Sequence, residues 1–483
     1  MTYKVIPERR VLGTVPPWFV SLAIDTSVLI GGRWWGPSKG TKEGLSVDRV
    51  APLDLEAPEL SRWAKPLAPA ILRVGGTEAD RIRYGFRHDG PEEPGPPRHP
   101  EGPFVLKGKL WESLNRWAAD HGFSVLFTVS AGPEARDEHG RWDPAEAERL
   151  LRNTARKGYP VAGWEFGNEV NAYPFLYGLS RSVSNRRYLE EFAVFADMVR
   201  RLAPGTRTVG PASAVWPLIG EPNPLIPALG RSPAAAALDV LSFHYYPQQS
   251  SRGPVAVRRA KESTLLSARS LDGMLRWIRH ARRSLARGPG ARAPLWITEA
   301  GHALYGGEPG LSDTWLSTPW WLDQLGLSAH AGVQAVFRQS LIGSDYGLLD
   351  QRDHSPRPDY FATLLWKTRM GPVALAKPRV EGRDRKLRAW HQGRADGGST
   401  VLLVNLHRKK TVFADVRANV RGVLVLEPLD GATSRTAVLN GVPLTAENGL
   451  KTVKAAGAGT PWSGPVKLPP LACAFVDLEP HAL

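Results

Sequence analysis

Two glutamates in this chain lie in surroundings that suit catalysis. Glu169 ends the stretch Gly-Trp-Glu-Phe-Gly-Asn-Glu at 163–169, and Glu299 ends Pro-Leu-Trp-Ile-Thr-Glu at 294–299. Each follows a short apolar run that is typical of a buried strand. Retaining hydrolysis of a glycosidic bond needs one carboxylic acid to protonate the leaving oxygen and one carboxylate to attack the sugar carbon. The pair therefore predicts glycoside hydrolysis.

The two glutamates must differ in protonation for this chemistry. We expect burial and the nearby charge of Glu299 to raise the pKa of Glu169, so that it stays protonated as the acid. A retaining pair would lie roughly 5–5.5 Å apart. Most glutamates are surface or salt-bridged residues, so the assignment depends on where the fold places these two.

The elements that must position them alternate along the chain. Apolar runs at 19–24, 70–74, 124–129, 162–166, 207–210, 240–245, 295–298 and 333–338 predict strands. Amphipathic patterns at 109–121, 144–157, 187–202, 271–287, 314–329 and 359–370 predict the helices between them. Eight such units are typical of a (β/α)8 TIM barrel, here over residues 14–373. Glu169 then follows the fourth strand and Glu299 the seventh, so both face the mouth.

Two further segments differ from the barrel pattern. Residues 85–103 are charged and rich in Pro and Gly, which predicts an exposed loop. After about residue 374 short strand-like runs at 387–391, 400–406, 411–416, 422–428 and 472–478 alternate with Gly and Asp-Gly turns. That pattern predicts a C-terminal antiparallel β-sandwich.

Composition limits the partners. The 483 residues carry a net charge of +15, which suits either a solvated Arg-rich surface or an acidic polymer as partner. The arginines are scattered, and no basic run with interleaved aromatics predicts nucleic-acid binding. Cys473 is the single cysteine, so no intrachain disulfide is expected. No run has the length of a membrane span, and no secretion signal is visible, so we expect a soluble protein of unassigned location.

Polar residues end other predicted strands. Asp25 follows the first strand and Thr77 follows the second. Asp25 suits either a sugar hydroxyl or a turn cap. Tyr245 ends the sixth strand, where a hydroxyl would hold the nucleophile ionised. His244 beside it suits the site and the core equally well.

Taken together, these stretches resemble glycoside hydrolase family 79, the heparanase and β-glucuronidase family. The resemblance rests on Arg-Val-Gly-Gly-Thr at 73–77, Trp-Glu-Phe-Gly-Asn-Glu at 164–169, His-Tyr-Tyr at 244–246 and Trp-Ile-Thr-Glu at 296–299. It continues through Tyr-Gly-Gly at 305–307, Pro-Asp-Tyr at 358–360 and, near the C-terminus, Leu-Pro-Pro-Leu at 468–471. It covers nearly the whole chain.

The resemblance implies a fold and a set of roles. Residues 1–13 would join residues 374–483 in the sandwich. Glu169 would be the acid/base and Glu299 the nucleophile, with no cofactor and no metal. Tyr245 would steady Glu299, or Tyr246 if the register shifts by one. The remaining substrate-binding residues would be Asn168, Asp25 and Thr77 for sugar hydroxyls, and the backbone N–H groups of Gly306 and Gly307 with Tyr346 for a uronate carboxylate.

Four departures from the family pattern stand out. The stretch from Glu299 to Tyr305 is one residue longer than in mammalian heparanase, and Glu308 stands where a third glycine is expected, so it would repel an anion. The long cleavable linker is missing, so we expect one uncleaved chain. Residues 212–238 hold Arg231 as the only base, in place of a basic heparin-binding segment.

We therefore expect a monomeric, retaining, heparanase-like β-glucuronidase acting on acidic oligo- or polysaccharides that contain glucuronic acid, of the heparan sulfate type. An exo-acting β-glucuronidase on small glucuronides is the first alternative. A related glycosidase for neutral sugars and a non-catalytic heparin- or carbohydrate-binding protein are the others. Product size from heparan sulfate distinguishes endo from exo action.

Overall fold

The computed structural model describes residues 1–35, 47–86, 104–253, 257–457 and 459–480. The exposed loop predicted at 85–103 therefore lies almost wholly outside the described residues. Its first residue, Gly85, ends β7 (Ile82–Gly85), which pairs in parallel with β8 (Phe104–Lys107). A second ribbon, β4 (Gly32–Trp35) with β5 (Val47–Val50), is antiparallel.

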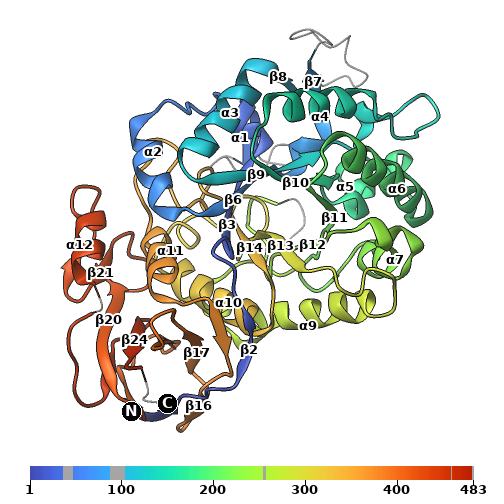
Figure 1. Ribbon diagram of the computed structural model, residues 1–483. Helices are drawn as coiled ribbons and strands as arrows, with labels where there is room; N and C mark the ends of the chain where they lie inside the picture. The colour runs from blue at the N-terminus through green and yellow to red at the C-terminus, as the bar shows by residue number, and fades with distance from the viewer. Residues whose placement is uncertain (36–46, 87–103, 254–256, 458, 481–483) are drawn as a thin grey trace.

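Eight parallel strands close into a barrel in the order β10-β11-β12-β13-β14-β3-β6-β9 (Figure 1). Each predicted strand is confirmed, with its ends displaced by a few residues. The strands are β3 (Val20–Asp25), β6 (Ala70–Gly75), β9 (Phe123–Val129), β10 (Val161–Phe166), β11 (Arg207–Ser213), β12 (Val240–Tyr245), β13 (Leu295–Ala300) and β14 (Ala335–Gln339).

The helices surround the barrel, and the six predicted ones are confirmed (Figure 1). They are α3 (Gly108–Asp120), α4 (Ala145–Lys157), α6 (Asn185–Leu202), α9 (Ala268–Leu285), α10 (Ser317–His330) and α11 (Pro358–Arg369). Shorter helices are α1 (Thr26–Ile30), α2 (Pro58–Ala64), α5 (Tyr173–Leu176), α7 (Leu225–Arg231), α8 (Glu262–Leu265) and, in the C-terminal part, α12 (Gly449–Ala456). Within the described ranges no helix is both long enough and apolar enough to cross a bilayer.

The inside of the barrel changes from apolar to polar along the strands. Ile71, Val240 and Trp296 belong to an apolar cluster that fills the lower interior. Because side chains alternate along a strand, the inward positions two residues further on are Arg73, Ser242 and Thr298. All six side chains are buried. The mouth is therefore lined by polar groups that stand on an apolar floor.

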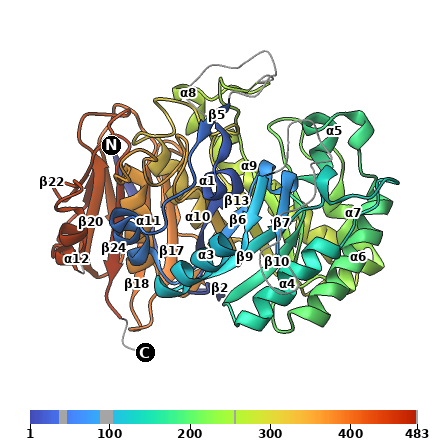
Figure 2. The same cartoon turned by 90° about the horizontal axis from the view of Figure 1, so that it is seen from above.

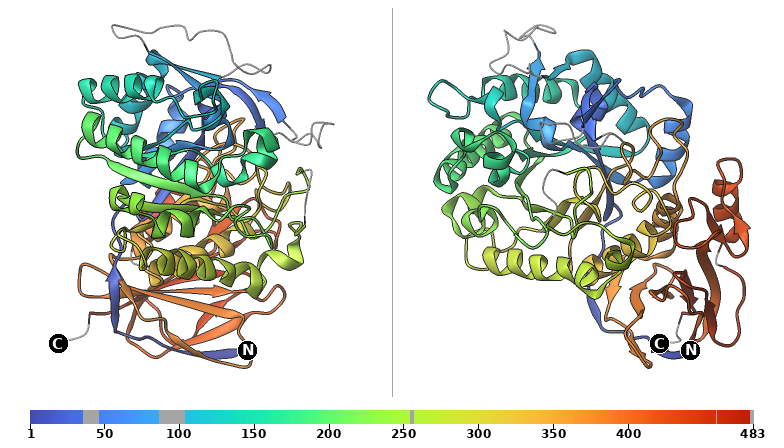
Figure 3. Two further views of the ribbon diagram at one scale, coloured as in Figure 1. Left: turned by 90° about the vertical axis from the view of Figure 1, so that its right-hand side faces the viewer. Right: turned by 180° about the vertical axis from the view of Figure 1, so that it is seen from behind.

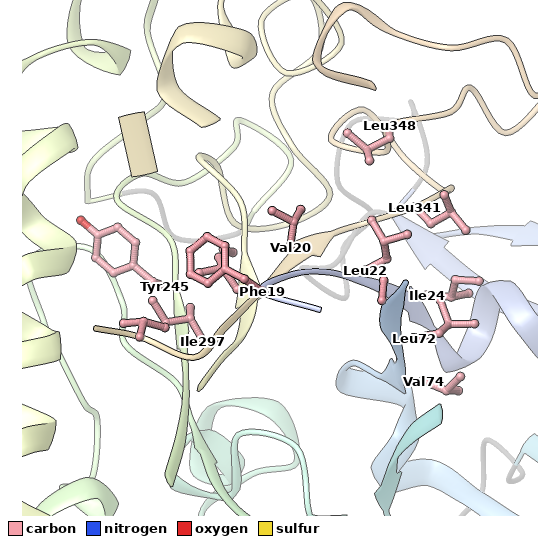
Figure 4. Close-up of a cluster of buried hydrophobic side chains, with 14 of the residues drawn as sticks. Phe19, Val20, Leu22, Ile24, Leu72, Val74, Tyr245, Ile297, Leu341 and Leu348 are labelled. Carbon is pink, nitrogen blue, oxygen red and sulfur yellow. The ribbon is translucent and has the colours of Figure 1, made fainter. Parts of the chain in front are cut away.

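A larger apolar core lies between the strands and the helices. Leu22, Leu72 and Ile297 point outward from their strands into this layer, and Figure 4 shows them with Phe19 and Tyr245. The strands are apolar on both faces over much of their length because a barrel of this kind buries both.

The rest of the chain forms two packed sheets beside the barrel (Figure 2). One sheet has the order β2-β15-β17-β18-β24-β20-β21-β22, and the other β16-β1-β19-β23. Their strands are β1 (Thr2–Ile6), β2 (Val11–Thr14), β15 (Val373–Leu375), β16 (Arg379–Glu381), β17 (Leu387–Gly393), β18 (Ser399–Asn405), β19 (Val412–Val416), β20 (Val420–Pro428), β21 (Ala437–Leu439), β22 (Val442–Pro443), β23 (Val466–Leu468) and β24 (Cys473–Leu478).

The first residues of the chain belong to these sheets. β1 pairs with β16 and β19, and β2 pairs with β15. Figure 3 shows the N-terminal strand, in blue, running along the C-terminal strands. The predicted sandwich with an N-terminal contribution is confirmed, although the β1–β19 pair is parallel rather than antiparallel.

The sandwich is fixed to the barrel through α10. Trp390 of β17 packs on Gly326, where an added Cβ would lie 2.2 Å from its ring. The Trp390 indole N–H donates to Asp323 Oδ1 over 2.8 Å, and Arg388 Nε donates to the same oxygen over 2.9 Å. Arg388 Nη2 also donates to Asp272 of α9 over 2.7 Å. We call Arg388, Trp390, Asp323 and Asp272 the interface cluster.

Candidate active site

Glu169 is held at the mouth by a tight turn after β10. Its backbone is left-handed, with φ 53° and ψ 42°, which is uncommon for a residue with a side chain. Gly167 in the same turn has φ 71°, and a Cβ there would lie 2.5 Å from Val170 Cγ2. The Glu169 N–H donates to Ala212 O of the next strand over 3.1 Å. Such conformations cost on the order of 1–3 kcal/mol and concentrate at functional sites.

Glu299 of β13 meets Glu169 across the mouth, with His244 between them. His244 Nδ1 lies 2.9 Å from Glu169 Oε1 and 3.6 Å from Glu299 Oε2. One oxygen of each carboxyl and one ring nitrogen lie within 4.8 Å of one another. The two carboxyl groups are therefore brought together as their positions after the fourth and seventh strands predict.

Arg73 is the hub of the polar mouth. It is fully buried, and its guanidinium donates to Glu165 Oε2 over 2.7 Å, to Glu299 Oε1 over 2.8 Å and to Asn168 Oδ1 over 2.9 Å. Its Nη2 also lies 3.3 Å from His244 Nε2. A guanidinium has no acceptor, so this ring nitrogen accepts and the proton is on Nδ1. His244 then donates to Glu169.

The carboxyls of the pair share burial but differ in their contacts. Burial raises the pKa of Glu169, and the charge of Glu299 adds to this, while the His244 hydrogen bond acts against both. Burial also raises the pKa of Glu299, against which Arg73 and Tyr246 stabilise its charged form. Burial lowers the pKa of His244, so its ring is neutral.

Tyr246, not Tyr245, contacts the second glutamate. The Tyr246 hydroxyl donates to Glu299 Oε2 over 2.7 Å, whereas that of Tyr245 faces Ser270 O of α9 at 3.5 Å. The expectation for Tyr245 is wrong because of strand parity. His244 shares the inward face of β12 with Ser242, so Tyr245 points outward, and Tyr246 turns back over the mouth once the strand has ended.

Asp25 lies beside the pair. Its carboxylate occupies the space next to Gly76, where an added Cβ would lie 1.9 Å from Oδ1. Gln339 Nε2 donates to Asp25 Oδ2 over 2.5 Å and lies 3.5 Å from the Tyr346 hydroxyl. Burial, and then the charge of Glu299, raises the pKa of Asp25 well above its usual range.

Asn168 and Thr77 lie on the same rim. Asn168 Oδ1 accepts from Arg73 and, over 3.2 Å, from the Gly76 N–H. Both acceptor bonds use its oxygen, so its NH₂ is left for another acceptor. Thr77 begins a short 3-10 helix and is half-buried, and its carbonyl accepts from the Tyr177 hydroxyl over 3.0 Å.

The Tyr-Gly-Gly loop lies against the segment that carries Tyr346. Gly306 O accepts from the Asp345 N–H over 3.0 Å, and a Cβ on Gly307 would lie 2.9 Å from Tyr346 N. Both glycines have positive φ, 80° and 88°. Among the residues that the structure describes, the amides of Gly306 and Gly307 have no hydrogen-bond acceptor. The Tyr346 ring lies 6.5 Å from that of Tyr246, which links the loop to Glu299.

Two charged residues stand behind that loop. Arg252 is buried, donates to Gly307 O over 3.0 Å and pairs with Asp345 Oδ2 at 2.5 Å. Glu308 is turned to Ser251, whose N–H and hydroxyl both donate to its carboxylate. The negative charge at position 308 is therefore held by two donors of a neighbouring loop.

Glu169, His244 and Glu299 also have the residue types of a metal site, the one group of this kind in the described part of the chain. Arg73 argues against a cation there, because its guanidinium lies 2.8 Å from Glu299. His244 Nδ1 also carries a proton in the tautomer assigned above. The donor set fits proton transfer better than metal binding.

Sequence reasoning missed three residues of the site, Arg73, Glu165 and Gln339, and it named Tyr246 only as the alternative to Tyr245. Arg73 and Glu165 are charged residues inside apolar strands, and charges are rarely buried unless they are paired. That signal was readable in β6 and β10. It indicates an ion pair without saying which residue is the partner.

A closed parallel barrel whose mouth joins two buried carboxyls defines the chain as a glycoside hydrolase of the barrel type. Residues 22–326 match the N-terminal domain of glycosyl hydrolase family 79. The chain therefore belongs to that family, and the resemblance drawn from its motifs is confirmed.

Relatives with named activities align over most of the chain. Heparanase-like protein 1 of Arabidopsis thaliana is 28% identical over 418 residues, which cover 82% of this chain and 73% of the relative. Heparanase of Rattus norvegicus is 28% identical over 90% of this chain and 85% of the relative. Baicalin-β-D-glucuronidase of Scutellaria baicalensis is 27% identical over 73% and 69%.

Solved structures share the fold. The family-51 arabinofuranosidase of Xanthomonas axonopodis pv. citri superposes with a TM-score of 0.67 at 14% identity, over 99% of both chains. At that identity the likeness concerns the barrel and the sandwich, not the substrate.

Proposed function

We propose that this chain hydrolyses β-linked glucuronic acid with retention of configuration, as a heparanase-type β-glucuronidase. The observation that carries the proposal is that one oxygen of Glu169 and one of Glu299 lie within 4.8 Å of each other, close to the separation of about 5–5.5 Å in retaining pairs. Inverting pairs are separated by about 6.5–9.5 Å to leave room for a water.

The roles follow from the contacts. Arg73 and Tyr246 each donate to one oxygen of Glu299, so this carboxyl carries the negative charge. Glu169 has one oxygen bonded to His244, and its other oxygen holds the proton. Glu169 protonates the glycosidic oxygen as Glu299 attacks the anomeric carbon; the bond between that carbon and the glycosidic oxygen breaks, the alcohol leaves, and Glu299 is joined to the sugar as an ester. A water then gives its proton to Glu169 and attacks the same carbon, which releases Glu299.

The preference for a uronate is supported by the Tyr-Gly-Gly loop. A carboxylate on the sugar needs donors, and the amides of Gly306 and Gly307 have no acceptor among the described residues. Tyr346 adds a hydroxyl, and Arg252 adds a cation behind the loop, although Asp345 shares its charge. Glu308, which would repel the substrate, is bound to Ser251 instead. Asp25, Asn168 and Thr77 are proposed to bind sugar hydroxyls.

The test is to trap the intermediate. An activated 2-fluoro-glucuronide should label Glu299 as an ester, seen by peptide mass spectrometry, and Glu299→Gln should take no label. The first product formed from an aryl β-glucuronide should be the β-anomer by NMR. An α-anomer as first product would exclude the retaining mechanism, and turnover of neutral β-glycosides alone would exclude the uronate preference.

The polymer assignment needs its own measurement. We expect oligosaccharides from heparan sulfate, since the net charge of +15 favours an acidic polymer. Release of monosaccharide alone would make the enzyme an exo-acting β-glucuronidase.

A further inference from the structure

Helix α9 presents a row of arginines to solvent on the outside of the barrel. Arg269, Arg276, Arg279 and Arg283 follow one another at helical spacing and are all exposed, while the opposite face packs on the core. We call these four residues the arginine row. From first to last it extends along roughly 20 Å of helix, at 1.5 Å per residue. Figure 1 shows α9, in yellow-green, along the outer edge of the barrel.

The row is not neutralised by acids. Among the described residues no carboxylate pairs with any of its four guanidinium groups. Asp272 lies on the same face but belongs to the interface cluster, where Arg388 lies 2.7 Å from it. Glu221 lies 3.8 Å from His280 of the same helix α9; its side chain is 3% exposed, and burial raises its pKa to about 7.

More positive charge adjoins the row. Arg258 is half-buried beside it, and after burial the charges of Arg269 and Arg276 further lower its pKa. The pKa of His280 is lowered by burial and by Arg231 and Arg283. Uncompensated arginines crowded on one surface produce a strong field for an anionic polymer.

Two hollows border the row. One, of about 450 Å³, is lined by Trp216, Ile219 and Trp277 together with Arg276 and Arg283. The other, of about 590 Å³, lies between Arg269, Leu275 and Arg279. Trp216 and Trp277 are half-buried, so each ring keeps an exposed part beside a guanidinium. Aromatic rings next to cationic donors suit sugar rings that carry carboxylate or sulfate groups.

The row begins near the active site. Ser270, in the first turn of α9, accepts from the Tyr245 hydroxyl at 3.5 Å, and Tyr245 precedes the residue that holds Glu299. A Cβ on Gly273 would lie 2.2 Å from the same hydroxyl. The first turn of α9 therefore lies directly behind the rim of the mouth, and the row leads away from it down the side of the barrel.

We propose that the arginine row and its two hollows form a second binding surface for an acidic polysaccharide, outside the catalytic mouth. The partner is a chain of sugars with repeated carboxylate or sulfate groups, the polymer class of the proposed substrate, so this inference rests in that respect on the proposed function. One hollow touches the segment at 212–238 through Trp216 and Ile219, but the positive charge comes from α9, because that segment lacks the expected bases. The surface retains a long chain while the mouth acts on one linkage.

The experiment compares two triple variants of equal charge. Arg276, Arg279 and Arg283 are changed to Gln in the first, and Arg116, Arg152 and Arg200 in the second. The control arginines are exposed, and each pairs with an acid on its own helix. Binding of a fluorescent heparin icosasaccharide is measured by anisotropy at several salt concentrations. We expect the first variant to bind about tenfold more weakly, with a smaller salt slope, and the control to bind like wild type.

Several outcomes overturn the proposal. Equal weakening in both variants would mean that only net charge matters, and no weakening in the first would remove the row from binding. Tighter binding of an oligo-dT of similar length, lost in the same variant, would assign the row to nucleic acid instead. A further variant with Arg276, Arg279 and Arg283 changed to Lys keeps the charge and should keep most of the heparin binding. Its affinity still tests the proposal if the Gln variant does not fold.

Turnover separates this inference from the catalytic one. An aryl β-glucuronide occupies only the mouth, so the first variant should cleave it with an unchanged kcat/KM, while its KM for long heparan sulfate rises and kcat stays the same. If the wild type cleaves no glucuronide, the proposed function is wrong. The heparin-binding measurement still shows whether the arginine row binds an acidic polysaccharide.

Discussion

Two arginines in this molecule, the fully buried Arg73 and the partly buried Arg388, each bind more than one acid but have different effects on them. Arg388 of the interface cluster binds Asp323 with two donors and reaches Asp272 with one. Arg73 at the mouth binds Glu165 and Glu299, but two further carboxyls, Glu169 and Asp25, stand close to the same charge.

The difference is one of charge balance. At the interface the charge of Arg388 is paired with the carboxylates of Asp323 and Asp272, and this contact joins the two domains. At the mouth one guanidinium faces four carboxyls, and burial first, then repulsion between the carboxylates, raises the pKa values of Glu169, Glu299 and Asp25. Surplus acid around a single buried base leaves a proton available for chemistry.

The largest effect is expected from Glu299→Gln. Removal of the covalent nucleophile should lower kcat by a factor on the order of 10⁴ or more, as in other enzymes with covalent intermediates. The measurement is turnover of an aryl β-glucuronide, with binding of the substrate retained. Near-normal turnover would remove Glu299 from the mechanism.

Glu169→Gln should lower kcat/KM by about 10²–10⁴ for substrates with poor leaving groups, and far less for activated aryl glucuronides. It should also stabilise the fold at neutral pH, by on the order of 1 kcal/mol per unit of pKa shift. The folded pKa of Glu169 is raised, so its contribution is favourable below the ordinary carboxyl pKa and is lost as pH rises through the raised value. Thermal melts from pH 4 to 8 test this, and a destabilised variant would contradict it.

Arg73→Lys keeps a charge, but an ammonium has three N–H donors and no fixed fork, so it cannot serve the four acceptors around Arg73. We expect roughly a 10²-fold loss of kcat, comparable with the loss of one preorganised donor. Because Arg73 lowers the pKa of Glu299, the acidic limb of the pH–rate profile should move to higher pH. Arg388→Lys is the matched control. If its pH–rate profile also shifted, the two clusters would not differ in their effect on catalysis.

Tyr246→Phe removes one hydrogen bond to Glu299, worth about 1.5–3 kcal/mol for a charged acceptor, so we expect a loss of about 10- to 100-fold in kcat. Tyr245→Phe removes a weak bond to Ser270 and should leave kcat unchanged. Comparing kcat of the two variants shows which tyrosine stabilises Glu299. A larger loss in Tyr245→Phe than in Tyr246→Phe would assign that role to Tyr245.

The smallest kinetic effect is expected from Asp323→Asn in the interface cluster. It leaves Arg388 with the exposed Asp272 as its remaining carboxylate partner, so the loss of stability should approach the roughly 3–5 kcal/mol that breaking a buried pair costs. Denaturant titration should show the loss of stability, while kcat/KM at permissive temperature stays that of wild type. A changed pH–rate profile would show that the two clusters are coupled.

Much of this architecture could be predicted from periodicity alone. The eight strands and six helices follow from apolar runs and amphipathic patterns, and the strand-end positions of Glu169 and Glu299 place them at one mouth. The role of Tyr245 could not be resolved because a shift of one residue moves a side chain to the other face. Val240, Ser242 and His244 all face inward along β12, so the alternation predicts that Tyr245 faces outward. This is the signal that favours Tyr246 over Tyr245.

The network around Arg73 lay beyond sequence reasoning for another reason. Its partners come from β10, β12 and β13, and no local pattern says which buried acid meets which buried base. Gln339 is similar, since its bond to Asp25 joins the last barrel strand to the first. Contacts that close a barrel are the least local ones in the chain.

The place of β1 between β16 and β19 also bears on how the protein is made. As the polypeptide leaves the ribosome, its opening strand has no neighbour until nearly the whole chain has followed. The smaller sheet can then be completed only after synthesis of its last strands, so the ordering of the first and last segments is a late, shared event. Trimming a handful of residues from the start would remove an inner strand of a sheet built otherwise from the end.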